Sequence, residues 1–277
     1  MNRRTKSKGT ARRRRPRRKQ VSSPLMDWWR RLKRRLKRRY RQNRLALIAL
    51  VIGLAAVAFL FQQVKSSRKD RVTVASSIYN GIDVSKHQGR INWQRVAEDK
   101  KIQFVYIKAT EGSSLVDKTY RRNITEARKN GLMVGSYHFF TSYKTPVDQY
   151  KNFKKQVKKS EQDLIPMVDV EEAGNRYAKR DVLQQRLWTF MNLVKADYGK
   201  YPILYSQYKF YNDMLAPDFN KCFIFIARYG NVAPTLRGGG KYNVWQFTER
   251  GKVDGIKGYV DLDVFSNGTT LDDILLK

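Results

Sequence analysis

Short apolar segments alternate with amphipathic segments across the last 200 residues of this chain, and this alternation constrains its fold more than any other feature. Helical periodicity appears over 93–99, 117–130, 146–159, 180–198 and 207–215. The apolar runs, which have the length and composition of strands, are 79–84, 104–108, 133–138, 165–171, 202–205, 223–227, 242–247 and 259–265. Strands that alternate with helices pair in parallel through right-handed crossovers.

The sequence therefore predicts an α/β fold in which eight strands and five helices form a closed barrel. The last three strands are separated by loops rather than helices, so we expect the final third of the barrel to be irregular. An open doubly wound sheet is the alternative. No Gly-rich phosphate loop follows the first strand, which disfavours a nucleotide-binding version of that sheet.

Positive charge is concentrated near the N-terminus. Residues 1–44 contain 21 of the 57 Lys and Arg residues and one of the 24 acidic residues, so they carry about +20 and the remainder about +13. The first 24 residues have too few apolar side chains to offset the entropy of ordering, and we expect a disordered tail. An amphipathic helix suited to lipid headgroups is expected over 25–44, with one apolar face formed by Trp28, Trp29, Leu32, Leu36 and Tyr40.

Residues 45–61 form an uninterrupted run of 17 uncharged, mostly apolar residues. As a helix this run would span about 25 Å, so we expect residues 45–64 to form a single transmembrane helix. A cleaved signal peptide is the alternative, but 44 residues precede the run and no small-x-small cleavage site follows it. We therefore expect an uncleaved signal-anchor.

The charge asymmetry also predicts an orientation. Basic residues remain on the cytoplasmic side, which puts 1–44 in the cytoplasm and everything beyond the anchor outside it, in the periplasm or on the cell-wall side. Nucleic-acid binding is another interpretation of the basic tail, but this rule explains the charge without it, so no specific nucleic-acid partner is expected. Residues 65–76 are polar and form the expected linker to a folded domain over 77–277.

Acidic residues occur at the ends of several predicted strands. Asp83 ends the first strand, Asp169 and Glu171 end the fourth, and Asp261 and Asp263 lie in the last. Residues i and i+2 of a strand project from the same face, and a parallel barrel gathers the carboxyl ends of its strands at one rim. These acids are either ordinary solvent-exposed carboxylates or members of one site. Paired carboxylates at one site are what glycoside hydrolysis requires, and mutual repulsion would raise the pKa of at least one of them.

Metal-dependent and thiol-dependent hydrolysis are disfavoured. His87 and His138 are the two histidines, and neither lies in the spacing typical of a zinc site. Cys222 lies within an apolar run, where a thiol is ordinary core, and a single cysteine excludes an internal disulfide. We therefore expect no metal and no cofactor.

Five segments together resemble the glycoside hydrolase family 25 lysozymes. They are GIDVSKHQG (81–89), FVYIKATEG (104–112), GSYHFF (135–140), PMVDVEE (166–172) and VWQFTERGKVDGIKGYVDLDVF (244–265), and the resemblance extends over 79–268. It implies an irregular (β/α)5β3 TIM-like barrel. It also implies N-acetylmuramidase activity, which cuts the β-1,4 bond between N-acetylmuramic acid and N-acetylglucosamine in peptidoglycan.

The resemblance also implies roles for individual residues. Glu171 matches the general acid/base, and Asp169 matches the residue that stabilises the transition state, by orienting the substrate's acetamido group as an internal nucleophile. Asp83 and Asp261 match supporting acids, whereas Asp263 stands where relatives commonly carry Asn and can shift the pH optimum. The expected sugar-contacting residues are His87, Gln88, Tyr106, Tyr137, His138, Tyr205, Tyr229, Trp245 and Gln246.

Some of these assignments have alternatives. Tyr106, Tyr205 and Tyr229 fit core packing as well as they fit a groove wall. A barrel that binds cell-wall glycan without cutting it is the alternative function, but such a binder has no use for a proton donor. We therefore expect a membrane-anchored, monomeric lysozyme whose partners are peptidoglycan and the cytoplasmic membrane. The net charge of about +13 outside the tail suits an anionic polymer.

Overall fold

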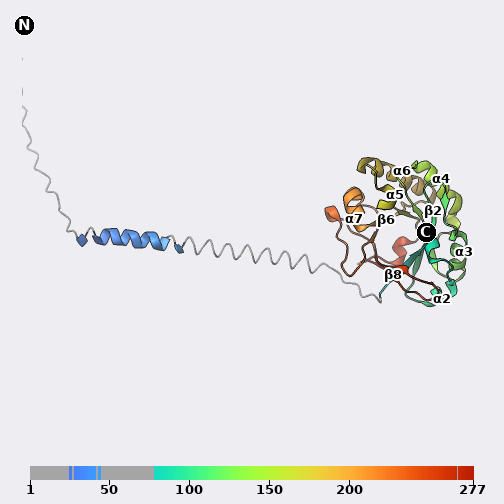
Figure 1. The fold of residues 1–277 in the computed structure, drawn as a ribbon, viewed down its shortest axis with the longest axis horizontal. Coiled ribbons are helices and arrows are strands. Elements are labelled where there is room, and N and C mark those ends of the chain that lie inside the picture. The colour runs from blue at the N-terminus through green and yellow to red at the C-terminus, as the bar shows by residue number, and fades with distance from the viewer. Residues whose placement is uncertain (1–24, 27, 42, 45–77, 267) are drawn as a thin grey trace, which may run out of the picture. The chain divides into compact units, whose positions relative to one another are not determined.

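The computed structural model describes residues 25–26, 28–41, 43–44, 78–266 and 268–277 (Figure 1). None of the helices in these ranges combines the length and the apolar character needed to cross a membrane. The predicted tail over 1–24, the predicted transmembrane helix over 45–64 and the predicted linker over 65–76 lie outside the described residues.

The described residues between 25 and 44 are helical and belong to a different unit from the folded domain. Trp28, Trp29, Leu36 and Tyr40 are each more than half exposed on this helix, and Leu32 is partly buried. The helix therefore presents large apolar side chains to its surroundings among many arginines and lysines.

The folded domain is built on a closed barrel of eight strands. The strands are β1 (Gly81–Val84), β2 (Phe104–Glu111), β4 (Met133–Phe139), β5 (Met167–Asp169), β6 (Ile203–Gln207), β7 (Ile224–Ala227), β8 (Val244–Gly251) and β9 (Val260–Phe265). Neighbours pair in the order β1-β9-β8-β7-β6-β5-β4-β2, and β1 also pairs with β2, which closes the barrel. This closure confirms the predicted barrel and excludes the open sheet. A short strand, β3 (Leu115–Val116), pairs antiparallel with Thr110 and Glu111 at the end of β2.

The pairing directions explain the irregular final third. Every pair from β1–β2 round to β7–β8 is parallel, whereas β9 runs antiparallel to both β8 and β1. No α-helix separates β7, β8 and β9 in this described part of the chain, and only a short 3-10 turn, η4 (Arg237–Gly239), lies there. Antiparallel neighbours need no helical crossover, so a hairpin is sufficient to join β8 to β9.

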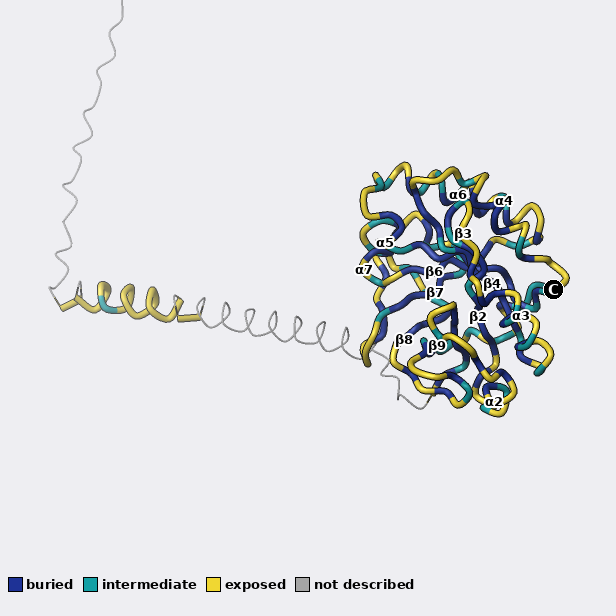
Figure 2. The backbone as a smooth tube through the Cα atoms, turned by 45° about the vertical axis from the view of Figure 1, so that its right-hand side comes forward, coloured by how far each residue is buried: buried dark blue, intermediate teal, exposed yellow. Residues whose placement is uncertain are grey.

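Helices cover the outside of the parallel part of the barrel (Figures 1 and 2). They are α2 (Trp93–Glu98), α3 (Tyr120–Lys129), α4 (Pro146–Gln156), the short α5 (Glu172–Asn175), α6 (Arg180–Tyr198) and α7 (Tyr208–Phe210). The predicted fifth helix over 207–215 is only one turn of α-helix that continues into a π-helical turn, η3 (Tyr211–Leu215). At α4, the Thr145 hydroxyl accepts from the backbone N–H of Asp148, and Pro146 occupies the first turn, where its missing N–H costs nothing.

Alternation along the strands divides the core into two layers. Outward-facing residues such as Val105, Val168 and Leu204 pack with the helices, whereas inward-facing residues such as Phe104 and Phe225 fill the barrel interior. The strands appear as buried segments in Figure 2 because both of their faces are covered. Bulky side chains therefore close the interior below the carboxyl ends of the strands, where the polar residues lie.

Candidate active site

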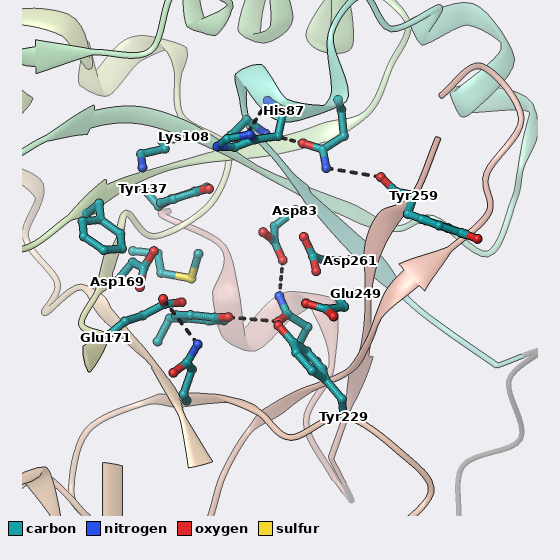
Figure 3. Close-up of a pocket in the computed structure, with 17 residues that line it drawn as sticks. Asp83, His87, Lys108, Tyr137, Asp169, Glu171, Tyr229, Glu249, Tyr259 and Asp261 are labelled. Carbon is teal, nitrogen blue, oxygen red and sulfur yellow. Dashed lines mark hydrogen bonds between the residues drawn. The ribbon is translucent and has the colours of Figure 1, made fainter. Parts of the chain in front are cut away.

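A cleft of about 520 Å³ opens where the parallel strands end (Figure 3). Its lining includes the four carboxylates predicted from sequence: Asp83 from β1, Asp169 from β5, Glu171 just beyond β5 and Asp261 from β9. Asp83 and Asp261 are direct partners in the β1–β9 register, and Asp169 and Glu171 share a face through their i, i+2 spacing. The structure thus brings the four acids together. Glu249 of β8, which the sequence did not single out, is the fifth acid in the lining.

A hydrogen-bonded glutamine fixes one side of this cluster. Gln246 is 1 % exposed, and its Nε2 donates to Asp83 Oδ2 at 2.6 Å. The Gln246 Oε1 accepts from the hydroxyls of Tyr205 at 2.9 Å and Tyr229 at 3.2 Å. Because each end of the amide has its own partners, the orientation of Gln246 is determined, and the position of the Asp83 carboxyl is determined with it.

Burial raises the pKa of all four carboxyls. For Asp83 and Asp169, burial lifts the pKa well above its ordinary range, and the neighbouring carboxyls of Asp261 and Glu171 respectively add to the shift. Burial and then Glu249 raise the pKa of Asp261 to about 7. Burial also raises the pKa of Glu171, against the opposing effects of Lys108 and the Tyr205 hydroxyl. The cluster therefore retains protons near neutral pH, as a proton donor must.

Lys108 is the one lysine in the lining of this cleft. Its Nζ lies 2.8 Å from Glu111 Oε2 and 4.6 Å from the ring centroid of Phe139. Its positive charge lowers the pKa of both Asp169 and Glu171 and so opposes the effect of burial on them. Lys108 was not predicted as a site residue. It is a charged residue in the otherwise apolar predicted strand 104–108 and lies two residues after the inward-facing Tyr106, so strand parity places it on the same face.

Six of the nine predicted sugar-contacting residues line the cleft. Burial and then the charges of Asp83, Asp169, Asp261 and Glu171 raise the pKa of the Tyr137 hydroxyl well above its ordinary value. Figure 3 shows this hydroxyl directed toward the side of the cleft that carries Asp83. The six that line the cleft are His87, Gln88, Tyr137, Tyr205, Tyr229 and Gln246.

The other three predicted sugar-contacting residues, Tyr106, His138 and Trp245, do not line the cleft. His138 and Trp245 face outward from the barrel because each is adjacent to an inward-facing residue, and strand neighbours point to opposite faces. Tyr106 does face inward, but it lies one layer below the cleft, where its hydroxyl donates to the Ile165 carbonyl at 2.9 Å.

The two outward residues have structural partners instead. His138 is fully buried and stacks on Phe190, with 4.8 Å between ring centroids. Its Nε2 donates to Gln149 Oε1 at 3.2 Å, its Nδ1 accepts from the Thr110 hydroxyl at 2.8 Å, and burial lowers its pKa to about 3. Trp245 is 2 % exposed, and its Nε1 donates to the Arg228 carbonyl at 2.8 Å.

Asp263 lies beneath the cleft rather than in it. Its side chain is fully buried, and neither carboxyl oxygen has a hydrogen-bond partner among the described residues. Burial, followed by the charges of Asp83 and Asp261, raises its pKa well above the ordinary range. Burial without hydrogen-bond partners among the described residues favours the protonated form of the Asp263 carboxyl over the charged form.

Two further residues connect the cleft to its rim. Gln207 Nε2 donates to Glu171 Oε2 at 3.5 Å, and Gln88 Nε2 donates to the Tyr259 carbonyl at 3.3 Å. Neither Gln207, the last residue of β6, nor Tyr259, which directly precedes β9, was predicted as a site residue, because neither is an acid and neither has a distinctive spacing. Among the residues that the structure describes, no group of three or more His, Cys, Asp or Glu side chains is arranged to hold a metal ion.

The raised pKa of Asp261 predicts a pH-dependent effect on stability. A carboxyl whose pKa is about 4 when unfolded and about 7 when folded binds more protons in the folded state, so its ionisation destabilises the fold as pH rises through this window. We expect Asp261→Asn to raise the Tm by about 2–4 °C at pH 8 and by much less at pH 4, as measured by calorimetry. Asp254→Asn, at an exposed position, is the control. An equal change in Tm at both pH values would contradict the assignment.

Comparison with known proteins agrees with this geometry. The sequence profile described as glycosyl hydrolases family 25 matches residues 82–256. The protein YegX of Escherichia coli (strain K12) is 42 % identical over 199 residues, which cover 70 % of this chain and 72 % of YegX. An autolytic lysozyme of Clostridium acetobutylicum is 31 % identical over 192 residues, which cover 68 % of this chain and 56 % of that protein.

A solved structure supports the same assignment. The family 25 glycosyl hydrolase from Bacillus anthracis superposes with a TM-score of 0.65 at 32 % identity, covering 74 % of this chain and 96 % of the other. The profile match spans most of the barrel and includes Asp83, Asp169 and Glu171. This chain is a glycoside hydrolase and belongs to glycosyl hydrolases family 25.

Proposed function

We propose that this protein is a lysozyme that hydrolyses the β-1,4 bond between N-acetylmuramic acid and N-acetylglucosamine in peptidoglycan. The observation that carries the proposal is the convergence of Asp83, Asp169, Glu171 and Asp261 on one cleft in which burial raises the pKa of each. The relatives support the choice of substrate, since they include an autolytic lysozyme and a lysozyme M1 of Streptomyces globisporus.

Glu171 is the general acid and then the general base. It is half-buried, whereas Asp169 is 6 % exposed, so Glu171 is the member of this coupled pair that can reach a glycosidic oxygen. Burial raises the pKa of both carboxyls, and the Glu171 charge raises that of Asp169 further. The pair therefore retains a proton that Glu171 delivers to the leaving oxygen as the bond to C1 breaks. The resulting Glu171 carboxylate then takes a proton from the water that attacks C1.

Asp169 acts on the substrate's acetamido group. As positive charge develops at C1, the acetamido oxygen closes on that carbon, and Asp169 accepts a hydrogen bond from the acetamido N–H. Asp169 Oδ1 is buried and has no hydrogen-bond partner among the described residues, so it has an acceptor available for this contact. Water then opens the cyclic intermediate and leaves a hydroxyl on C1, and the net reaction is hydrolysis with retained configuration.

The remaining groups hold the cluster in position. Gln246 fixes the Asp83 carboxyl, and the Tyr137 hydroxyl, whose raised pKa keeps it protonated, supplies a hydrogen-bond donor in the lining of the same cleft. Asp261 adds a group with a pKa near 7 beside Asp83, which makes the charge of the cleft depend on pH near neutrality. Preorganised groups of this kind lower the cost of charge rearrangement during the reaction.

Product analysis tests the proposed function. Purified peptidoglycan should be digested by the full-length protein, and the soluble fragments should be identified by mass spectrometry after reduction with borohydride. Fragments that end in reduced muramic acid are expected. Fragments that end in reduced glucosamine would contradict the bond specificity, and an absence of fragments across pH 4–8 would favour a barrel that binds glycan without cutting it.

Removing the Lys108 charge should move the pH optimum upward. Lys108 lowers the pKa of Asp169 and Glu171, so Lys108→Met raises both values and lets the donor keep its proton at higher pH. We expect both limbs of the kcat/KM profile to shift upward by about 0.5–1 pH unit. Lys241→Met, at an exposed position outside the cleft, is the control. A downward shift, or an equal shift in the control, would contradict this role.

We also propose that residues 45–64 anchor the protein in the cytoplasmic membrane with residues 1–44 inside and the barrel outside. The uncharged run 45–61 and the basic excess before it support this arrangement. Protease added to intact spheroplasts should digest the barrel while residues 1–44 remain protected. A barrel that is protected until the membrane is broken would contradict the proposed orientation.

A further inference from the structure

A second groove, of about 760 Å³, lies between the loop that follows β4 and the segment from α5 to α6. It shares no lining residue with the acidic cleft. Both segments leave the carboxyl ends of adjacent parallel strands, β4 and β5, so the groove belongs to the rim of the barrel that carries the cleft. We call it the rim groove, and the lining residues that matter here are Tyr143, Gly174, Arg176, Tyr177, Lys179 and Arg186.

The rim groove is connected directly to the strand end that carries Glu171. Asn175, which lines the groove, donates from Nδ2 to the backbone carbonyl of Glu171 at 2.8 Å and to that of Phe140 at 3.2 Å. A Cβ atom on Gly174 would lie 2.7 Å from the Phe140 carbonyl, so the close approach of the two loops requires glycine there. The floor of the groove and the backbone of the proposed proton donor are therefore held as one unit.

The charged residues that line the rim groove are cationic, whereas most of those that line the cleft are acidic. Its lining contains three cations, Arg176, Lys179 and Arg186, and no acid. Arg186 donates from Nη1 to the Ser142 carbonyl, which holds its guanidinium against the groove wall. Arg176 and Lys179 are exposed, and neither forms an ion pair with a carboxylate in the described part of the chain.

Two tyrosines in the lining of the rim groove expose most of their aromatic surface. Tyr177 is 92 % exposed and Tyr143 is 69 % exposed, although large aromatic side chains normally bury most of their surface. Tyrosine supplies a rigid apolar face together with a polar hydroxyl, which is why it is enriched where proteins bind flexible polar chains. The groove thus offers aromatic surface and free cations to an anionic, partly apolar ligand.

We propose that the rim groove binds the peptide attached to muramic acid, through the carboxylates of that peptide. This inference rests on the proposed function, because it identifies a second part of the same substrate. The cleft is lined by five acids and one lysine and offers little to attract the peptide carboxylates, whereas the rim groove is lined by three cations, so charge complementarity directs the peptide of a glycan strand seated in the cleft toward the rim groove. Arg176 and Lys179 pair with the carboxylates, and Tyr143 and Tyr177 pack against the peptide backbone and its aliphatic groups.

Kinetics on two substrates test this inference with the full-length protein. One substrate is purified peptidoglycan free of phosphate-containing polymers, and the other is the same glycan after an amidase has removed its peptides. The double variant Arg176→Gln/Lys179→Gln should raise KM on intact peptidoglycan by about three- to tenfold, with kcat little changed, because two exposed ion pairs are lost. On peptide-free glycan both parameters should stay at the wild-type values. Tyr177→Ala should also raise KM on the intact substrate alone.

A matched control separates a local effect from a general loss of positive charge. Lys221→Gln/Arg237→Gln makes the same change in charge at two exposed positions outside both the cleft and the rim groove, and it should leave KM unchanged. The inference is overturned if the rim-groove variant keeps the wild-type KM on intact peptidoglycan, or if its KM rises equally on both substrates. Failure of the wild-type protein to cleave either substrate would instead contradict the proposed function.

Discussion

Glu171→Gln should lower kcat on peptidoglycan by about 10³-fold and leave KM within about threefold of the wild-type value. The amide has nearly the same shape as the carboxyl but cannot deliver a proton to the glycosidic oxygen. Steady-state release of reducing ends measures this change, and circular dichroism and Tm establish that the variant is folded.

The chain supplies a matched control for this substitution. Glu172 is the next residue and is exposed at the start of α5, outside the lining of the cleft. Glu172→Gln therefore makes the same chemical change one position away, and its kcat should remain within about twofold of the wild-type value. Similar losses in the two variants would mean that Glu171 has no special role as a proton donor.

Asp169→Asn should reduce kcat by about 10²- to 10³-fold. The asparagine retains an acceptor oxygen but loses the negative charge that develops as the pair gives up its proton, so the transition state loses electrostatic stabilisation. A thiazoline analogue of the cyclic acetamido intermediate gives a second readout. It should inhibit the wild-type protein competitively, and its affinity should fall at least about tenfold in Asp169→Asn.

The two readouts distinguish the proposed role of Asp169 from a purely structural one. A loss of kcat with unchanged affinity for the thiazoline would contradict the assignment of Asp169 to the acetamido group. A wild-type protein that does not bind the thiazoline would contradict participation of the acetamido group altogether, while leaving the proton-donor role of Glu171 open to its own test.

The barrel and the acid cluster were predictable because both follow from simple periodicities. Alternation of apolar and amphipathic segments implied parallel strands, and parallel strands place their carboxyl ends at one rim. The i, i+2 spacing of Asp169 and Glu171 then placed both side chains on one face. The structure confirms the barrel and brings these acids together with Asp83 and Asp261.

The same periodicity explains why some of the predicted sugar-contacting residues lie outside the cleft lining. Tyr137 and His138 are consecutive in one strand, as are Trp245 and Gln246, so only one member of each pair can face the barrel interior. The structure turns Tyr137 and Gln246 inward. Resemblance at the level of motifs does not distinguish a residue that contacts ligand from its neighbour that packs against a helix, whereas strand parity does.

The exposed residues of the rim groove and the contact between Gln207 and Glu171 could not be predicted from the spacing of nearby residues. Tyr177 and Arg176 lie in an irregular segment between α5 and α6, where no periodicity indicates which side chains will be exposed. Gln207 reaches Glu171 only because β5 and β6 pair in a particular register. Such contacts depend on long-range packing, which composition and spacing do not encode.

The most direct test of the central claim is a crystal structure of Glu171→Gln bound to a peptidoglycan tetrasaccharide. The proposed mechanism predicts that the scissile oxygen lies within about 3 Å of the residue 171 side chain, with the muramic acid acetamido N–H donating to Asp169. A tetrasaccharide bound outside the cleft, or one whose glycosidic oxygen is out of hydrogen-bond reach of residue 171 and whose acetamido group faces away from Asp169, would contradict it.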